Sequence, residues 1–359
     1  MASIATHYIF SNDVQLKLSN ISQTISSSIN QSHGAYIVGA QGPDLFFYDL
    51  MHLAITSKKD NIGSRMHTER TDNFFVNFIR EMLKQKVWDE PAIKAYLYGL
   101  LTHYCLDARV HPYVYSRTTL PSRSRQAMKD SLAAHCQMES DIDELLYHER
   151  FHQSISTAKR SQFMDISSDE IRTIAPVLTL AINTTYGCSL TTSYIIGTFN
   201  RARLTDHILQ DSTGLKKKLI SPVEKKLLGS TIGTSLLFHT ELPDRSCLNE
   251  DHRMWKFPAN GNFCTDSFYE LYDSAVKMAV KLIENCNTCI LDAAELYTVG
   301  KAVNADIDLT LNNKKGTSAD SPNDISASSQ LINDIILDFG RATGGLSYHS
   351  GVNWRRKND

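Results

Sequence analysis

Apolar residues recur every three or four positions along most of the chain, which is the spacing of one face of an α-helix. In residues 71–86, for example, Phe74, Phe75, Phe78 and Met82 share one face, and the charged residues lie opposite. The same pattern predicts helices over 91–107, 127–147, 193–210 and 266–285. Strict alternation of apolar and polar residues, which indicates a strand, is scarce. The predicted fold class is therefore all-α.

The segment 303–326 interrupts the helical pattern. It is rich in Asn, Asp, Ser and Thr and reads as a polar loop or linker. A last amphipathic helix is expected over 325–339, broken by the glycines that follow it and succeeded by a polar tail. We therefore expect three parts, namely an all-helical domain over 1–300, a loop or linker over 301–326, and a C-terminal helix with a polar tail over 327–359.

Charge and composition exclude several classes of protein. The 359 residues carry 37 Lys and Arg against 39 Asp and Glu, so no basic field points to specific nucleic-acid binding. We see no secretory leader, no transmembrane segment and no basic amphipathic helix for a membrane surface, and so expect a cytoplasmic protein. The sequence favours no particular oligomeric state. The lone CxxC at Cys286 and Cys289 lies in a helical stretch and is read as chance.

Histidines paired with carboxylates are the most informative polar feature. His103 and Asp107 stand four residues apart on one predicted helix, and His111 extends the same face by another turn. His135 and Glu139 repeat this spacing on a second predicted helix. Two such helices packed face to face could converge nitrogen and oxygen ligands on a metal. Spacing alone leaves the choice between a metal site and a polar helix surface open.

The sequence motifs around these pairs decide between a metal site and a polar helix surface. THYIF, GPDLFFYD, GSRMH, YGLLTHYCLDARVHPY and HCQMESDID occur in this order within the first 143 residues. This ordered set resembles the zinc-dependent phospholipase C family, whose metal-site pattern is similar to that of single-strand-specific zinc nucleases. The resemblance implies a multi-helix bundle of that type with a site for two or three Zn²⁺ ions. It covers the N-terminal two-fifths of the chain well.

Carried over residue by residue, the resemblance implies a set of five imidazole and three carboxylate ligands. Asp44 matches an aspartate that acts as a ligand or as the base that activates water, and Asp107 matches a carboxylate that bridges two zinc ions. The backbone amine of Ala2 is a further expected ligand once Met1 is removed. The full set of side chains is His7, Asp44, His67, His103, Asp107, His111, His135 and Glu139. Such a set suits zinc.

The implied activity is zinc-dependent hydrolysis of a phosphodiester, phospholipase C-like, releasing diacylglycerol and a phosphorylated head group from a phospholipid. Clustered zinc ions neutralise charge on the phosphoryl group and lower the pKa of a bound water, and Asp44 would orient or deprotonate that water. One alternative is a cytoplasmic or nuclease-like phosphodiesterase on a soluble substrate. Another is a metal-binding protein without turnover. An apolar mouth would favour a lipid, and an aromatic stacking platform a nucleotide.

Weaker candidates surround this set. The pair His207 and Asp211 is read as a solvated helix face, although it has ligand spacing. Phe46 and Phe47 could touch an acyl chain, with core packing as the more frequent role. Further residues that could support the site or contact substrate are His52, His239, Asn249, His252 and Trp255.

Overall fold

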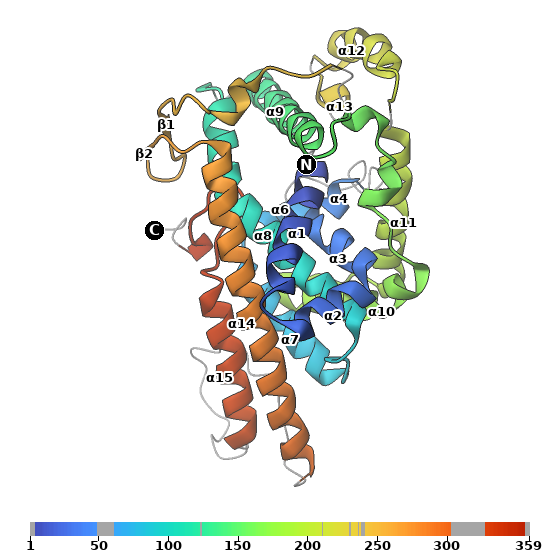
Figure 1. Ribbon diagram of the computed structural model, residues 1–359, viewed down its shortest axis with the longest axis vertical. Helices are drawn as coiled ribbons and strands as arrows, with labels where there is room; N and C mark the ends of the chain where they lie inside the picture. The colour runs from blue at the N-terminus through green and yellow to red at the C-terminus, as the bar shows by residue number, and fades with distance from the viewer. Residues whose placement is uncertain are drawn as a thin grey trace.

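The computed structural model describes residues 4–48, 61–122, 124–209, 211–229, 231–235, 237, 241–302 and 327–355. These residues form an all-α protein, which confirms the predicted fold class (Figure 1). The exception among them is a two-residue antiparallel pair, β1 (Trp255–Lys256) with β2 (Phe263–Cys264), in which Trp255 faces Cys264. Among the described helices, none combines the length and apolar character needed to cross a membrane.

The N-terminal half forms the body of the protein around one long helix. The elements are α1 (Ile4–Ser19), α2 (Gln23–Gln31), α3 (His33–Ala40), η1 (Gly42–Asp44), α4 (Leu45–Tyr48), α6 (Ile62–Thr68), α7 (Thr71–Lys84), α8 (Pro91–Thr118) and α9 (Arg125–Phe151). Helix α8 packs against α1, α2, α3 and α9, so it crosses the centre of the body. The side chains of α8 are buried along most of its length.

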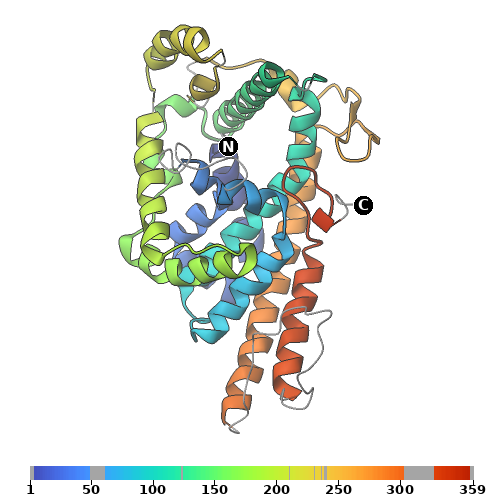
Figure 2. The same cartoon turned by 180° about the vertical axis from the view of Figure 1, so that it is seen from behind.

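The remaining elements surround this body. They are η2 (Ile155–Thr157), η3 (Arg160–Phe163), α10 (Ser168–Tyr186), α11 (Thr192–Leu209), α12 (Leu215–Leu228), α13 (Ile232–Ser235), η4 (Arg245–Leu248), α14 (Phe268–Ala302) and α15 (Ala327–Ala342). Helices α14 and α15 pack side by side and project together beyond one end of the body (Figures 1 and 2). The predicted linker over 303–326 lies outside the described residues, so the division into three parts stays a prediction.

Two helices run further than the sequence pattern predicted. Helix α8 continues past residue 107 to Thr118, because Val110, Tyr113 and Val114 extend its buried face beyond the polar side chains that interrupt it. Helix α14 continues past residue 285 to Ala302 in the same way. Its next buried residues include Cys286 and Cys289, so the CxxC belongs to the apolar core.

Helices α3 and α8 cross with their backbones in contact at two glycines. A Cβ added to Gly39 would lie 2.3 Å from the carbonyl oxygen of Tyr96, and one added to Gly99 would lie 2.1 Å from that of Tyr36. Only glycine permits so close an approach. This crossing fixes the distance between α8 and the turn η1 that follows α3.

The C-terminal segment after α15 folds back over the body. The expected break at Gly340 does not occur, because this glycine lies inside α15, where a Cβ would meet Val76 at 2.5 Å. Beyond α15, the Tyr104 hydroxyl donates to Thr343 O at 2.7 Å and accepts from Leu346 N at 2.7 Å. The expected polar tail is also anchored, since Trp354 Nε1 donates to Asp72 at 2.8 Å.

Helix α12 corrects another expectation, that the chain has no basic amphipathic helix. The segment is helical from Leu215 to Leu228 despite Pro222 in its interior, and it carries five lysines and several exposed leucines. Asp211, predicted to lie on a solvated face, is buried and accepts hydrogen bonds from the backbone N–H groups of Lys216 and Lys217 at 3.2 and 2.8 Å. It thereby satisfies two of the free donors at the start of α12.

Candidate metal centre

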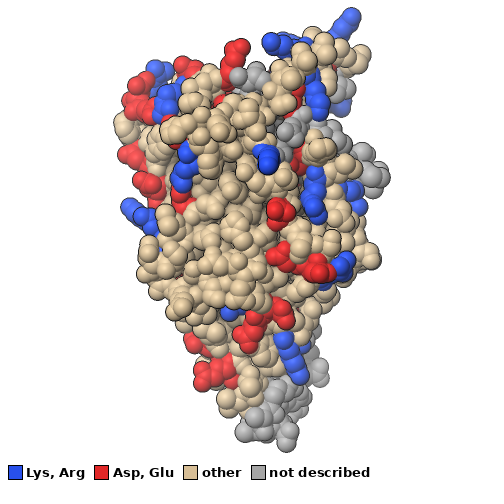
Figure 3. All heavy atoms as spheres, turned by 45° about the vertical axis from the view of Figure 1, so that its right-hand side comes forward, with Lys and Arg blue, Asp and Glu red and all other residues tan. Residues whose placement is uncertain are grey.

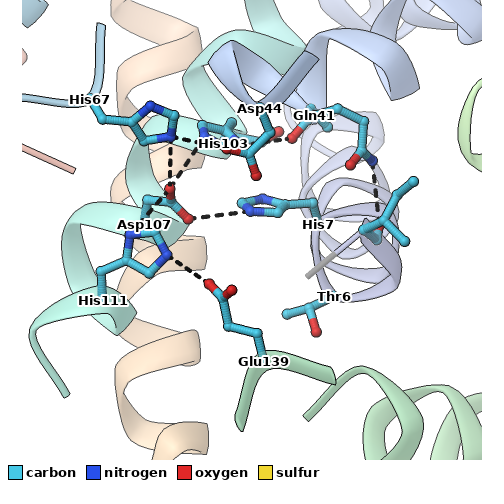
Figure 4. Close-up of polar contacts among 12 residues, drawn as sticks. Thr6, His7, Gln41, Asp44, His67, His103, Asp107, His111 and Glu139 are labelled. Carbon is cyan, nitrogen blue, oxygen red and sulfur yellow. Dashed lines mark hydrogen bonds and ion pairs between the residues drawn. The ribbon is translucent and has the colours of Figure 1, made fainter. Parts of the chain in front are cut away.

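The eight side chains that the sequence nominated lie together in the interior, and we call this set the metal centre. Figure 4 labels all of them except His135. They come from five elements that are far apart in sequence. The contributors are α1 (His7), η1 (Asp44), α6 (His67), α8 (His103, Asp107, His111) and α9 (His135, Glu139). All eight are buried. Burying so many ionisable groups is costly unless they neutralise one another or bind a metal.

Asp107 is the central carboxylate of the set. Its Oδ1 lies 3.2 Å from His7 Nε2, and its Oδ2 lies 3.2 Å from His103 Nε2 and 3.4 Å from His111 Nδ1. His67 Nε2 is 3.8 Å from the same Oδ2. One carboxylate thus faces four imidazoles from three helices, which is the arrangement expected of a ligand shared between two cations.

Three groups within the centre have the spacing of metal ligands, and the first two of them share His103. His7, His103 and Asp107 form the first group, and Asp44, His67 and His103 form the second. Asp44 Oδ1 lies 3.1 Å from His67 Nε2. The third group is His111, His135 and Glu139.

The third group spans the contact between α8 and α9. Glu139 Oε1 lies 3.0 Å from His111 Nε2 and 3.2 Å from His135 Nε2. Asp107 and His111 are only four residues apart in sequence. Both can face the centre because α8 continues unbroken through them, so residues four apart remain on one face.

Two backbone carbonyls orient the histidines of the second group. His67 Nδ1 lies 2.7 Å from Gly63 O, and His103 Nδ1 lies 3.1 Å from Ala40 O. A carbonyl oxygen only accepts, so each Nδ1 must carry a proton, and each Nε2 is the nitrogen that faces the centre and would bind a metal once deprotonated. Hydrogen bonding of the outer ring nitrogen is the usual way in which a metal-ligating histidine is held.

Helix α1 is positioned from the opposite side of the centre. Asp143 of α9 accepts hydrogen bonds from the Thr6 backbone N–H at 2.7 Å and from the Thr6 hydroxyl at 2.6 Å. This carboxylate therefore fixes the first turn of α1, and with it the neighbouring His7. Burial raises the pKa of Asp143 to about 7.

The charges of the centre are strongly coupled to one another. Burial alone raises the pKa of Asp107, but the charges of His111 and His103 outweigh it and hold that pKa well below its ordinary value. Burial lowers the pKa of His103 and of His111, and Asp107 more than reverses this, so both pKa values are raised. Without a cation, ionised Asp107 and the protonated forms of His103 and His111 thus stabilise one another. A bound zinc ion would take the place of those protons.

Several buried atoms of the centre lack a hydrogen-bond partner among the described residues. They are His7 Nδ1, His103 Nε2, Asp107 Oδ2, His111 Nδ1 and His135 Nδ1. His103 Nε2 and Asp107 Oδ2 lie 3.2 Å apart without hydrogen-bond alignment, and both residues belong to the first ligand group. A void of about 10 Å³ lies beside His7, Asp107, His111 and Glu139, about the room of one small sphere. Unsatisfied nitrogen and carboxylate oxygen atoms around small voids fit zinc.

His349 is the residue at the centre that sequence reasoning missed. Its ring lies 5.3 Å from that of His67 and 5.9 Å from that of His111, between the second and third groups, yet it belongs to none of the three. Burial, followed by the charges of His67 and His111, lowers the pKa of His349 well below its ordinary value, so the imidazole is neutral. No spacing signal marked this histidine, because its neighbours at the centre are more than 200 residues away in sequence.

The loop that carries His349 is held against two helices of the centre. Tyr348 N donates to His67 O at 2.9 Å, and the Ser347 hydroxyl donates to the same oxygen at 3.3 Å. Gly351 has a φ of +64°, and a Cβ there would lie 2.5 Å from the carbonyl oxygen of Ala108 in α8. The loop therefore fits α8 only with glycine at this position.

The weaker candidates divide into three kinds. Ala2, His52 and His239 lie outside the described residues. Asn249, His252 and Trp255 have structural contacts. The Asn249 amide donates to three backbone carbonyls, His252 Nδ1 lies 3.2 Å from Thr265 O, and Trp255 is buried against Tyr113. The third kind comprises the phenylalanines that follow Asp44. Phe46 is buried in the apolar core, and the centroid of the Phe47 ring lies 5.2 Å from that of the His67 ring.

A groove of about 650 Å³ leads from the surface to the third group. His135 and Tyr115 form its inner end, and the Tyr115 ring contacts the rings of both His135 and His349 at 4.6 and 5.2 Å. Its outer wall comprises Thr118, Thr119, Leu120, Pro121, Ser122, Met128, Ser131 and Leu132. This wall is mainly apolar and carries no stack of aromatic rings.

Comparison with known proteins agrees with this geometry. The family model described as zinc dependent phospholipase C matches residues 6–184, a stretch that contains all eight side chains of the metal centre. Searches of curated proteins and of solved structures found no match. Through this half of its length, the chain belongs to the zinc-dependent phospholipase C family.

Proposed function

We propose that the protein is a zinc-dependent phospholipase C, hydrolysing a phospholipid to diacylglycerol and a phosphorylated head group. The family and the three ligand groups support the broader statement of a zinc hydrolase acting on phosphoester bonds. The lipid substrate is the further step. It rests on the groove, because an apolar wall next to ligand His135 suits the acyl part of a substrate whose phosphate lies at the centre.

The eight side chains would hold zinc, which when bound would neutralise charge at the phosphate and lower the pKa of an attacking water. Asp44 would accept the proton of that water. Its carboxylate is buried. Burial raises its pKa, and the contact with His67, whose Nε2 lies 3.1 Å from Asp44 Oδ1, helps to bring that pKa below its ordinary value, so the carboxylate is ionised at neutral pH. Asp107 would hold the imidazoles of two groups in fixed relation, which keeps the phosphate site rigid.

His349 would bind a nonbridging oxygen of the phosphate or position the leaving group. Its neutral ring stands between two ligand groups and takes part in neither, which leaves it available to the substrate. Its ring also contacts that of Tyr115, a residue of the groove lining.

The test of the function is hydrolysis by zinc-loaded and zinc-stripped protein. We expect diacylglycerol from detergent-dispersed phosphatidylcholine, loss of product after chelation, and recovery when zinc is returned. Asp44→Asn should lower kcat by about 10²-fold or more while the amide oxygen retains much of the zinc. Turnover of bis(4-nitrophenyl) phosphate without any lipid hydrolysis would favour the soluble phosphodiesterase instead. Bound zinc with neither activity would indicate a metal-binding protein without turnover.

His349→Ala should leave the zinc content unchanged and lower kcat/KM about tenfold or more, because one hydrogen bond to a charged phosphate is lost. His349→Asn, which keeps a donor on a short side chain, should restore part of the loss. Zinc analysis and kinetics on the same samples provide the measurement. A fall in zinc content matching the fall in rate would show that His349 is instead a metal ligand.

A further inference from the structure

The outer face of α12 carries a stripe of exposed apolar side chains. Leu215, Leu219, Val223 and Leu227 are each four residues apart, so they lie along one side of the helix. Leu219 and Leu227 are 71% and 75% exposed. Leucines this exposed on a surface helix indicate that another molecule covers this face when the protein functions.

Lysines flank this stripe. The helix contains five lysines and a single acidic residue, Glu224. Glu224 is turned toward the protein, where its carboxylate accepts hydrogen bonds from the backbone of Gly233 at 2.6 Å and Thr234 at 2.9 Å. Lys217 is also drawn inward, since its Nζ donates to Leu237 O at 3.3 Å. The exposed lysines are Lys216, Lys218, Lys225 and Lys226. The outward side of α12 is therefore apolar and positively charged.

The helix lies next to the mouth of the groove. Gln126, in the first turn of α9, donates to Gly229 O at 2.7 Å just beyond the end of α12. Two large apolar residues of the groove wall, Leu120 and Met128, are 46% and 60% exposed in the same region. We call the α12 stripe together with Leu120 and Met128 the docking face. Helices α12 and α9 lie at the end of the molecule opposite the projecting tips of α14 and α15 (Figure 1).

Space-filling spheres show the same distribution. At the upper right of this view, lysine and arginine side chains stand beside uncharged surface (Figure 3). Acidic side chains lie at the upper left and in the lower half of the view.

We propose that the docking face binds the surface of an anionic phospholipid bilayer. Exposed leucines along one side of a helix with lysines beside them are the pattern of a helix that lies in the membrane interface. A second copy of the chain is a poorer occupant, because pairing this face with itself would bring lysine against lysine. The proposal rests on the proposed function, which requires that phospholipid reach the groove beside the docking face.

Vesicle binding by the intact zinc-loaded protein tests the proposal. We expect it to sediment with vesicles of phosphatidylcholine mixed with phosphatidylserine, and much less with phosphatidylcholine alone. Lys218→Gln with Lys225→Gln should weaken binding to anionic vesicles about 25-fold, at about fivefold per lysine. Leu219→Ser with Leu227→Ser should weaken it about tenfold or more by removing apolar burial.

Matched controls lie on other exposed helices. Lys277→Gln with Lys281→Gln on α14, and Leu16→Ser with Leu331→Ser on α1 and α15, remove the same groups elsewhere and should leave binding unchanged. All variants should hydrolyse bis(4-nitrophenyl) phosphate at the wild-type rate. A protein that hydrolyses this soluble diester but does not bind vesicles would overturn the docking proposal and leave the hydrolase intact. The docking proposal would also be overturned if the α12 variants bound vesicles as tightly as wild type. It would equally be overturned if the wild-type protein were a dimer that the α12 variants dissociate.

Discussion

Asp107→Asn is expected to remove at least one zinc ion per chain and to lower kcat/KM by about 10³-fold or more. The carboxylate faces His7, His103 and His111, so a neutral amide there weakens more than one ligand group at once. An amide offers one oxygen where the carboxylate offers two, and it leaves the surrounding imidazoles without their counter-charge. The negative charge that develops on the phosphate in the transition state would then be less well stabilised, because a metal ion and the rigid arrangement of its ligands are both lost.

Elemental analysis and thermal unfolding together measure this effect. Zinc that binds only the folded state raises Tm, so wild-type protein should gain stability when zinc is returned, and Asp107→Asn should gain less. Asp211→Asn is the matched control, because Asp211 is also a buried aspartate but caps α12 away from the centre. It should keep the wild-type zinc content. Equal zinc in wild type and Asp107→Asn would rule out a bridging role for this carboxylate.

The sequence was sufficient for the parts of the molecule that are determined locally. Helices such as α7 follow from apolar spacing alone, and the pair of His103 and Asp107 lies on one helix face as the four-residue interval requires. Bringing that pair near His7 and His67 depended on the resemblance, because spacing within one helix says nothing about which helix packs against it. That these side chains bind zinc remains a proposal.

What the sequence did not reveal depends on contacts between distant segments. His349 reaches the centre because Tyr104 and Asp72 hold the C-terminal loop, and neither contact leaves a periodic pattern in the tail. Helix α12 was missed for another reason. Pro222 lacks the N–H that a helix interior needs, which favours a turn by local rules, while Asp211 at the N-terminus of the helix stabilises it in the folded protein.

Gly99→Ala is expected to have the largest effect on stability, lowering the free energy of unfolding by about 3 kcal/mol or more. Its new Cβ would fall 2.1 Å from Tyr36 O and 2.7 Å from Ala40 N, both of them backbone atoms of α3 that cannot move aside independently. The helices must separate, and the apolar contacts around the buried rings of Tyr36 and Tyr96 are then loosened. Urea unfolding of the zinc-free protein measures the loss directly.

The same substitution should also weaken zinc binding, although Gly99 touches no ligand. Separating α3 from α8 moves Ala40 O away from His103 Nδ1, a contact of 3.1 Å that fixes the orientation of this ring. Gly197→Ala is the control, because it too is a helical glycine but its Cβ would meet only the flexible end of Arg201. Alanine there should be neutral or stabilising by up to about 1 kcal/mol. Wild-type stability in Gly99→Ala would mean that α3 and α8 can move apart freely, so the α3–α8 crossing would not be what positions Asp44 and His103 for zinc.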